Sequence, residues 1–266
     1  MQLLRNIPEV LPQPCVATIG FFDGVHRGHR YLIEQVREVA VVHGFASGVV
    51  TFPVHPRKVV QPEYHPELLT AYEEKVALLA ETGLDYCMML DFTPEVAILS
   101  AKEFMLFLYN HYNIRALVIG YDHRFGHNRS EGFDDYVRYG QELGIEVILA
   151  HAYIDKDVAV SSSVIRQLLS EGNVSEAASC LGYDYFLNGI VVSGYRVGRK
   201  IGFPTANLRV DDPDKLVPSD GVYAVRVTVA GQSYGGMLSI GYRPTMANGT
   251  AVSYTHLRAH ETELHL

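Results

Sequence analysis

Residues 16–29 read VATIGFFDGVHRGH, and they give the first indication of the fold class. Its first seven residues form a short apolar run rich in β-branched and aromatic side chains, which predicts a buried strand. Residues 31–40, YLIEQVREVA, have the period of a helix. The chain therefore passes from strand to helix within a few residues, a connection typical of α/β folds.

The same alternation of short apolar runs and helical stretches continues to about residue 149. Strands that read as near-continuous apolar runs indicate a parallel sheet with helices on both faces, so we predict a doubly wound α/β fold. In such sheets ligands bind beyond the carboxyl ends of the strands. The further strands are predicted at 47–52, 86–92, 116–122 and 146–150, with helices from about Gly28, after Thr70, near Lys102 and over 133–144.

The pattern changes after residues 161–182, which are predicted to form two short helices separated at Gly172 and Asn173. From about residue 183 the helical period disappears. Short β-rich pieces at 188–194, 221–231 and 233–242 are broken by Gly and Pro turns, which is typical of a small antiparallel barrel or sandwich. We therefore predict an α/β domain over residues 1–182 and an antiparallel β-barrel domain from residue 183.

Composition excludes several classes of protein. With 48% hydrophobic and 20% charged residues the chain is globular, and no apolar run approaches the roughly 20 residues that span a bilayer. A net charge of -8 argues against a surface built to hold nucleic acid. The first 14 residues lack the basic stretch and the unbroken apolar stretch of a secretory signal, so we expect none. No two of Cys15, Cys87 and Cys180 have metal-ligand spacing. We expect a cytoplasmic protein whose thiols are buried and form no disulfide. We expect it to bind neither nucleic acid nor a membrane.

Two histidines, His26 and His29, bracket the start of the first predicted helix. The unpaired amides of a helix's first turn and its dipole favour anions. Gly28 would let a phosphate approach the backbone, and both imidazoles can donate hydrogen bonds to its oxygens. This arrangement predicts a phosphate site, and a capped turn with two surface histidines is the alternative.

Two further segments have the same character. Ser161, Ser162 and Ser163 place hydroxyls at a helix start, with Arg166 in its first turn. Alone they would be an N-cap with a solvated arginine. Residues 119–126, IGYDHRFG, end a predicted strand with polar, aromatic and cationic side chains, and the alternative there is an irregular loop.

Together and in this order, these three segments resemble the nucleotidyltransferase module of bacterial bifunctional riboflavin kinase/FAD synthetases. The family's G-x-F-D-G-V-H-x-G-H signature is present at residues 20–29 and its T-F-x-x-H-P signature at 51–56. Its S-S-x-x-I-R signature is present at 161–166, and the likeness covers about residues 10–250. Two positions depart from the family: Phe21 stands where other members often carry Asn, and His123 where many carry an aromatic residue.

The resemblance implies adenylyl transfer, in which the phosphate of FMN attacks the α-phosphorus of ATP and pyrophosphate leaves. A magnesium ion would arrive with the triphosphate. The catalytic residues that the resemblance implies are His26, His29 and Arg166. The implied nucleotide-binding residues of this module are Gly20, Phe21, Asp23, Gly28, Ser161 and Ser162. The implied flavin-binding residues are His55, Asp122 and Phe125.

Residues 194–207, GYRVGRKIGFPTAN, form a second loop that can cradle phosphates. It is neither a Walker A loop nor a Rossmann motif, so an exposed basic hairpin is the alternative. It is similar to the riboflavin kinase signature. That resemblance implies that Thr205 and Asn207 hold Mg-ATP through hard oxygen ligands. The further nucleotide-binding residues that it implies are Gly198, Gly202 and Pro204.

The resemblance stops near Ser253. Family members continue into a strand with a glutamate that acts as general base on the riboflavin 5'-hydroxyl, and Thr255 stands at that position. The ending SYTHLRAHETELHL resembles translated sequencing-adapter read-through. We therefore expect an incomplete, inactive antiparallel β-barrel kinase domain over residues 183–252 and a non-native tail over 253–266.

The expected partners are the small molecules ATP, FMN and riboflavin. Two alternatives to FAD synthesis remain open: a nucleotidyltransferase for another phosphorylated acceptor, such as phosphopantetheine or nicotinamide mononucleotide, and a module that binds flavin and ATP without turnover. The appended kinase-like domain argues against the first. Measuring pyrophosphate release with a panel of acceptors separates the three.

Overall fold

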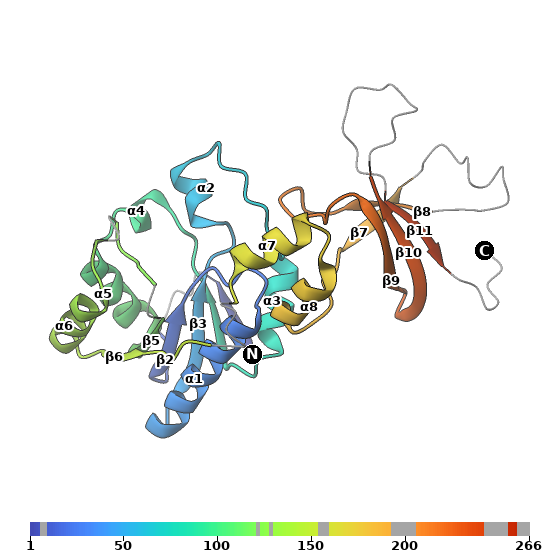
Figure 1. Ribbon diagram of the computed structural model, residues 1–266. Helices are drawn as coiled ribbons and strands as arrows, with labels where there is room; N and C mark the ends of the chain where they lie inside the picture. Colours follow the sequence, from blue (N-terminus) through green and yellow to red (C-terminus); the bar gives the residue numbers. More distant parts are fainter. Residues whose placement is uncertain are drawn as a thin grey trace, which may run out of the picture. The chain divides into compact units, whose positions relative to one another are not determined.

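The computed structural model describes residues 1–5, 10–120, 123–127, 130–153, 160–192, 206–241 and 255–259. The chain divides into two compact units (Figure 1). The first unit comprises Met1–Ser162 and Cys180–Gly182, and the second comprises Ser163–Ser179 and Tyr183–Leu266. Each unit contains one sheet.

The first sheet has six strands in the order β1-β4-β3-β2-β5-β6, and every neighbouring pair is parallel. This confirms the predicted α/β class. One strand, β1, was not predicted from the sequence. The strands are β1 (Gln2–Arg5), β2 (Cys15–Ile19), β3 (Ala46–Thr51), β4 (Tyr86–Met89), β5 (Ile114–Ile119) and β6 (Glu146–Leu149).

Helices connect these strands, and two short helices, most of whose residues belong to the second unit, follow β6. The longest, α1, crosses from β2 to β3 and ends at Gly44, which adopts a left-handed φ of 67°. The helices are α1 (Arg27–His43), α2 (Pro56–Val60), α3 (Tyr72–Ala80), α4 (Pro94–Ala97), α5 (Ala101–Tyr112), α6 (Phe133–Leu143), α7 (Ser162–Ser170) and α8 (Val174–Leu181).

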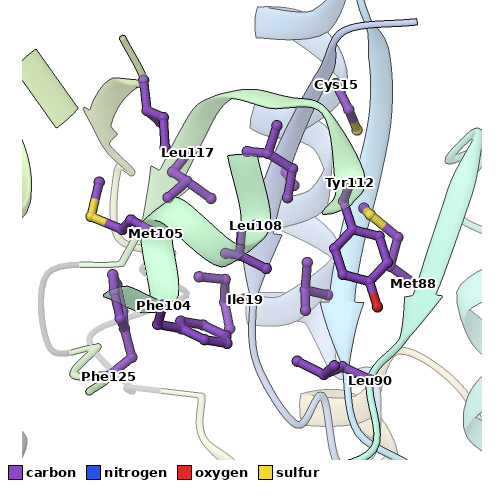
Figure 2. Packing of buried hydrophobic residues seen from close by; sticks show 14 of the residues in the cluster. Cys15, Ile19, Met88, Leu90, Phe104, Met105, Leu108, Tyr112, Leu117 and Phe125 are labelled. Atoms are coloured by element: carbon purple, nitrogen blue, oxygen red, sulfur yellow. The ribbon is translucent and has the colours of Figure 1, made fainter. Parts of the chain in front are cut away.

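Helices cover both faces of the parallel sheet. On one face, alternate residues of β2 pack with α5 in the main hydrophobic core (Figure 2). On the other face α1 lies against β2 and β3 and buries Ile33, Val36 and Ala40. The first core includes Cys15, Ala17, Ile19, Met88, Phe104, Met105, Leu108 and Leu117.

The expectation of buried thiols holds for two of the three cysteines. Cys15 and Cys87 are fully buried in β2 and β4, whereas Cys180 is partly exposed. Burial raises the pKa of Cys15 to about 12 and that of Cys87 to about 11. Both thiols are therefore protonated, and they pack as small apolar groups.

The order of the strands makes the carboxyl end of β2 a topological switch point. From β2 the chain passes to β3 and then to β4 on one side, and it later returns to β5 on the other side of β2. The connection after β2 therefore leads toward one edge of the sheet, and the connection after its neighbour β5 leads toward the other edge. In open α/β sheets the crevice at such a point is where ligands bind.

The second unit contains an antiparallel sheet with the strand order β7-β8-β11-β10-β9. This agrees with the predicted change from α/β to antiparallel β structure. The strands are β7 (Gly189–Val192), β8 (Ala206–Val210), β9 (Gly221–Val229), β10 (Gln232–Ile240) and β11 (Thr255–Ala259).

Strand β11 lies within residues 253–266, where a non-native tail is expected. Its backbone pairs with β10 on one side and with β8 on the other. A strand paired along both edges is an internal part of its sheet. The structure therefore gives no support to the expectation of a foreign tail.

Candidate active site

The loop between β2 and α1, residues 20–26, has an unusual backbone. Phe22, Gly24 and Val25 have positive φ angles of 55°, 82° and 36°. Positive φ is strained for a β-branched residue such as Val25, and it persists only where the surroundings impose it. A Cβ on Gly24 would lie 2.9 Å from Cδ1 of Leu69, so glycine is required there. This β2–α1 loop is therefore held in one conformation by its neighbours.

Asp23 anchors the loop to the segment before α3. It is 3% exposed, and its Oδ1 accepts hydrogen bonds from the amides of Leu69 at 2.9 Å and Thr70 at 3.0 Å. The Thr70 hydroxyl donates to the same oxygen and accepts a bond from the amide of Gly24. These hydrogen bonds of the carboxylate are all made within the protein, so nucleotide binding by Asp23 stays a prediction.

His26 is the N-cap of α1. Its Nδ1 accepts a hydrogen bond from the amide of His29 at 3.3 Å, which places the proton of the neutral ring on Nε2. A Cβ at Gly28 would lie 3.3 Å from the His26 imidazole. Glycine at this position therefore leaves space for the capping ring.

The two imidazoles lie together at the start of α1. Their centroids are 3.6 Å apart and their planes differ by 18°. His29 as a whole is half-buried, but its Nδ1 is buried and has no hydrogen-bond partner within the described residues. Burial first, and then His26 and Lys75, lower the pKa of His29 well below its usual value, so the ring is neutral. An unpaired buried polar atom costs about 1–3 kcal/mol, which a ligand oxygen could offset.

The serine segment reaches the same loop. The Ser162 hydroxyl donates to the carbonyl of Asp23 at 2.9 Å, across 139 positions of sequence. Ser161 lies directly before α7. The structure thus brings Ser162, at the start of α7, to the loop that leads into α1, so the two segments predicted to bind anions are in contact. Arg166 lies one turn further along α7, in the second unit, and its catalytic role stays a prediction.

The third segment follows β5, the neighbour of β2. Asp122 lies outside the described residues. Phe125 is 7% exposed and stacks on Tyr136 with centroids 4.1 Å apart, inside the main core. Its contact with flavin stays a prediction, because this packing buries most of the ring.

Phe21 and His55 meet although they come from different signatures. Their rings are in edge contact with centroids 4.8 Å apart. His55 caps α2, since its Nδ1 accepts from the amide of Arg57 at 3.2 Å, and its ring also lies near Tyr64. An aromatic cluster therefore lies between the ends of β2 and β3, beside Gly20, whose amide donates to Val50 of β3.

Lys75 of α3 is a residue of this site that sequence reasoning missed. It is 2% exposed, and its Nζ donates to the carbonyls of Phe21 at 3.1 Å and Phe52 at 2.7 Å. The only signal in the sequence is that Lys75 shares a helix face with the buried Leu78 and Leu79.

Most of the predicted kinase residues lie outside the described residues: Gly198, Gly202, Pro204 and Thr205. Asn207 lies on β8, where it pairs with Val192 of β7 and His256 of β11. Within the described ranges, no three His, Cys, Asp or Glu side chains are grouped so that they could hold a metal ion. No helix among the described residues is long and apolar enough to cross a membrane.

The chain combines a parallel α/β unit, which has a helix start at a topological switch point, with a second unit that contains an antiparallel sheet. Residues 9–164 match the family model of FAD synthetase, and residues 181–266 match that of riboflavin kinase. The chain belongs to the bifunctional riboflavin kinase/FMN adenylyltransferase family. It is therefore a transferase of FMN and FAD synthesis, as the sequence motifs predict.

Two relatives show how far the likeness extends. The bifunctional riboflavin kinase/FMN adenylyltransferase of Escherichia coli (strain K12) is 36% identical over 252 residues, which is 93% of this chain and 80% of that protein. The protein of the same name from Bacillus subtilis (strain 168) is 34% identical over 231 residues, which is 86% of this chain and 72% of that protein.

A crystal structure described as that of a macrolide-efflux protein from Streptococcus pneumoniae has the same fold. Its TM-score is 0.86 at 30% identity, and the match covers 99% of this chain and 86% of that one. The name concerns that protein, whereas both family models and the relatives from Escherichia coli and Bacillus subtilis agree on flavin synthesis. The riboflavin kinase match reaches residue 266, so it too gives no support to a foreign tail.

Proposed function

We propose that the first unit transfers the adenylyl group of ATP to FMN at the β2–α1 loop. An oxygen of the FMN phosphate forms a bond to the α-phosphorus of ATP. The bond from that phosphorus to the bridging oxygen breaks, and pyrophosphate leaves. The observation that carries this proposal is the stacked pair of His26 and His29 at a helix start, with a buried Nδ1 on His29 that has no partner within the described residues.

The residues of the loop have complementary roles in this proposal. The amides and dipole of the first turn of α1 favour the phosphates, and Gly28 allows them to approach. His26 donates from Nε2, and neutral His29 donates one hydrogen bond to the charge that develops on the α-phosphate. No protein nucleophile is needed, because alignment and charge stabilisation carry the reaction.

Other residues complete the proposed nucleotide site. In this proposal Ser161 and Ser162 bind the nucleotide phosphates, and Gly20, Phe21 and Asp23 bind the rest of the nucleotide. A magnesium ion bound to the triphosphate would neutralise part of its charge. The contact of Ser162 with the loop supports this assignment.

The flavin is proposed to bind next to the aromatic cluster. Phe21 and His55 offer apolar ring surface between the ends of two neighbouring strands, and planar aromatic ligands stack on such surfaces. Phe125 and Asp122 are the proposed contacts on the β5 side.

The test is a pyrophosphate-release assay with ATP and a panel of acceptors: FMN, phosphopantetheine and nicotinamide mononucleotide. We expect release with FMN only, and a loss of roughly 100- to 1000-fold in His29→Ala. His43→Ala, at the other end of α1, is the matched control and should keep wild-type turnover. Binding of ATP and FMN without pyrophosphate would indicate a binding module instead, and near-normal turnover by folded His29→Ala would refute the assignment.

For the second unit we propose a riboflavin kinase site that does not phosphorylate riboflavin in this chain. Its nucleotide would be held by the loop with Gly198, Gly202 and Pro204. Thr205 and Asn207 would offer hard oxygen atoms, which suit magnesium. Thr255 stands where the family carries its carboxylate base. It is the first residue of β11, where it pairs with Leu208, and the next residue, His256, pairs with Asn207.

The kinase proposal is tested with riboflavin and ATP. We expect no FMN from the wild-type chain, and detectable FMN from Thr255→Glu if the missing carboxylate is the cause. Phosphorylation by the wild type would contradict the proposal. We place the boundary between the two functions at residues 182 and 183.

We also propose a cytoplasmic location. The free, buried thiols of Cys15 and Cys87 support it.

A further inference from the structure

The strained β2–α1 loop needs fixed points, and the main chain of Phe21 is one of them. Its carbonyl accepts two hydrogen bonds, from Lys75 Nζ at 3.1 Å and from the Thr51 hydroxyl at 3.2 Å. The same Nζ donates to the carbonyl of Phe52 at 2.7 Å. One ammonium group therefore joins the chain leaving β2 to the chain leaving β3, just beyond the last ladder contact between the strands.

Lys75 also contacts the side chain of Phe21. Its Nζ lies 3.9 Å from the centroid of that ring, within the range of a cation–π interaction. The ring is also in contact with His55. Two carbonyls and one aromatic face together use the three donor hydrogens of the ammonium group.

The titratable groups around Lys75 come from three elements. Burial opposes the charged form of the amine, and Asp23 of the loop favours it. The nearby thiol of Cys87 in β4 is protonated and neutral, and Lys75 disfavours the cationic form of His29 in α1. The ammonium group is thus a buried positive charge close to the histidine pair. Lys75 is 2% exposed, so its charge acts on neighbouring groups and not at the protein surface.

We propose that Lys75 is a positioning residue for adenylyl transfer, whose ammonium group fixes the main chain and ring of Phe21 and so holds the loop that presents His26 and His29. This inference rests on the proposed function of the same site. Lys75 contacts the protein and not the reacting atoms. Its loss should therefore reduce kcat through misplacement of the histidines.

The protonation of Lys75 adds a pH signature. Burial lowers its pKa from 10.5 to about 8, so above that pH the free enzyme loses a donor and the cation–π contact. The unfolded chain binds more protons between pH 8 and 10.5, so the contribution of Lys75 to stability rises with pH there. Deprotonation of Lys75 therefore does not unfold the protein above about pH 8. We expect it to lower kcat/KM through loss of the loop contacts instead.

The experiment measures FAD formation against pH in the wild type, Lys75→Met and Lys75→Arg, with Lys102→Met as control. Lys102 is exposed on α5, where it pairs with Glu142. At pH 7 we expect Lys75→Met to lose roughly 10- to 100-fold in kcat, the scale of a small misplacement. Lys75→Arg should recover part of the lost kcat. Neither variant should show the fall in kcat/KM above about pH 8, that is, the alkaline limb of the pH profile.

Thermal melting checks the fold of each variant. If Lys75→Met does not fold, Lys75→Arg alone tests the proposal. A guanidinium does not titrate in this pH range, so the alkaline limb should be absent in Lys75→Arg. If the limb persists in this variant, the proposal is overturned. Wild-type kcat with an unchanged limb in Lys75→Met overturns it as well.

A readout without substrates separates this proposal from the proposed function. Ring nitrogen signals of His26 and His29 are followed by NMR in the wild type and the variants. We expect Lys75→Met to shift both and to raise the pKa of His29, since Lys75 lowers it. If the wild type forms no FAD, the proposed function fails, and unchanged ring signals would independently overturn the role of Lys75.

Discussion

Within the described residues, the β2–α1 loop, the C-cap of α5 at Asn113 and the β9–β10 turn hold residues other than glycine at positive φ. The β2–α1 loop and the β9–β10 turn do so for different reasons. In the β9–β10 turn, Ala230 and Gly231 have φ of 49° and 81°, between the paired Val229 and Gln232. Such angles are those of a two-residue hairpin whose twist matches the strands. In the β2–α1 loop, Phe22 and Val25 have positive φ because distant residues impose it.

The comparison shows that the same backbone conformation can be local or long-range in origin. The hairpin needs only its own strands. The loop depends on Thr51, Leu69, Thr70, Lys75 and Ser162, which come from three other regions of the chain. A costly conformation supported from so many directions is expected where geometry serves chemistry.

The largest expected effect comes from removing the main anchor of the loop. Asp23→Ala leaves the amides of Leu69 and Thr70 unpaired and removes the charge facing Lys75. We expect the free energy of unfolding to fall by about 3–5 kcal/mol, with loss of FAD formation. Urea denaturation measures the change, and substitution of the exposed Asp134 of α6, Asp134→Ala, is the control. A change below about 1 kcal/mol would mean that the loop is held by local forces.

A smaller effect is expected at Gly24. Gly24→Ala puts a Cβ 2.9 Å from Leu69 and imposes a φ of 82° on an alanine. We expect a loss of about 1–3 kcal/mol in stability, with a lower kcat because the histidines move. Gly231→Ala, at a similar φ of 81° with no atom near its Cβ, is the matched substitution and should cost about 1 kcal/mol without changing kcat. Equal effects of the two substitutions on kcat would remove the distinction between the turns.

The smallest effect is expected in the hairpin itself. Ala230→Asn introduces a residue that adopts left-handed backbone angles more readily than alanine does. The melting temperature should rise slightly, corresponding to a few tenths of a kcal/mol, and FAD formation should not change. A change in FAD formation would show that this turn affects the first unit's reaction.

Much of the fold could be predicted because its signals are local. Strands β2 to β6 are runs of apolar residues and α1 has a clear amphipathic period, so their positions follow from short windows of sequence. Strand β1 was missed because only Leu4 of its four residues is buried. It becomes a strand by pairing with β4, which no local pattern reports.

The site divides in the same way. His26, His29 and Gly28 were found because they are neighbours around a helix start, and the resemblance to a family rests on such short motifs. The motif that contains Phe125 predicts a flavin contact, and only the structure shows that its ring stacks on Tyr136 in the core. A motif gives the order of residues along the chain and not the packing of a side chain.

The class of enzyme, the alternation of strands and helices, and the two neighbouring histidines can be predicted from short windows of sequence, because periodicity and motif spacing are properties of adjacent residues. The folded chain was needed to show that Asp23 anchors the loop, that Ser162 donates to it from a distant segment, and that Lys75 joins the ends of two strands. These contacts depend on the strand order, which brings together residues that are far apart in the sequence.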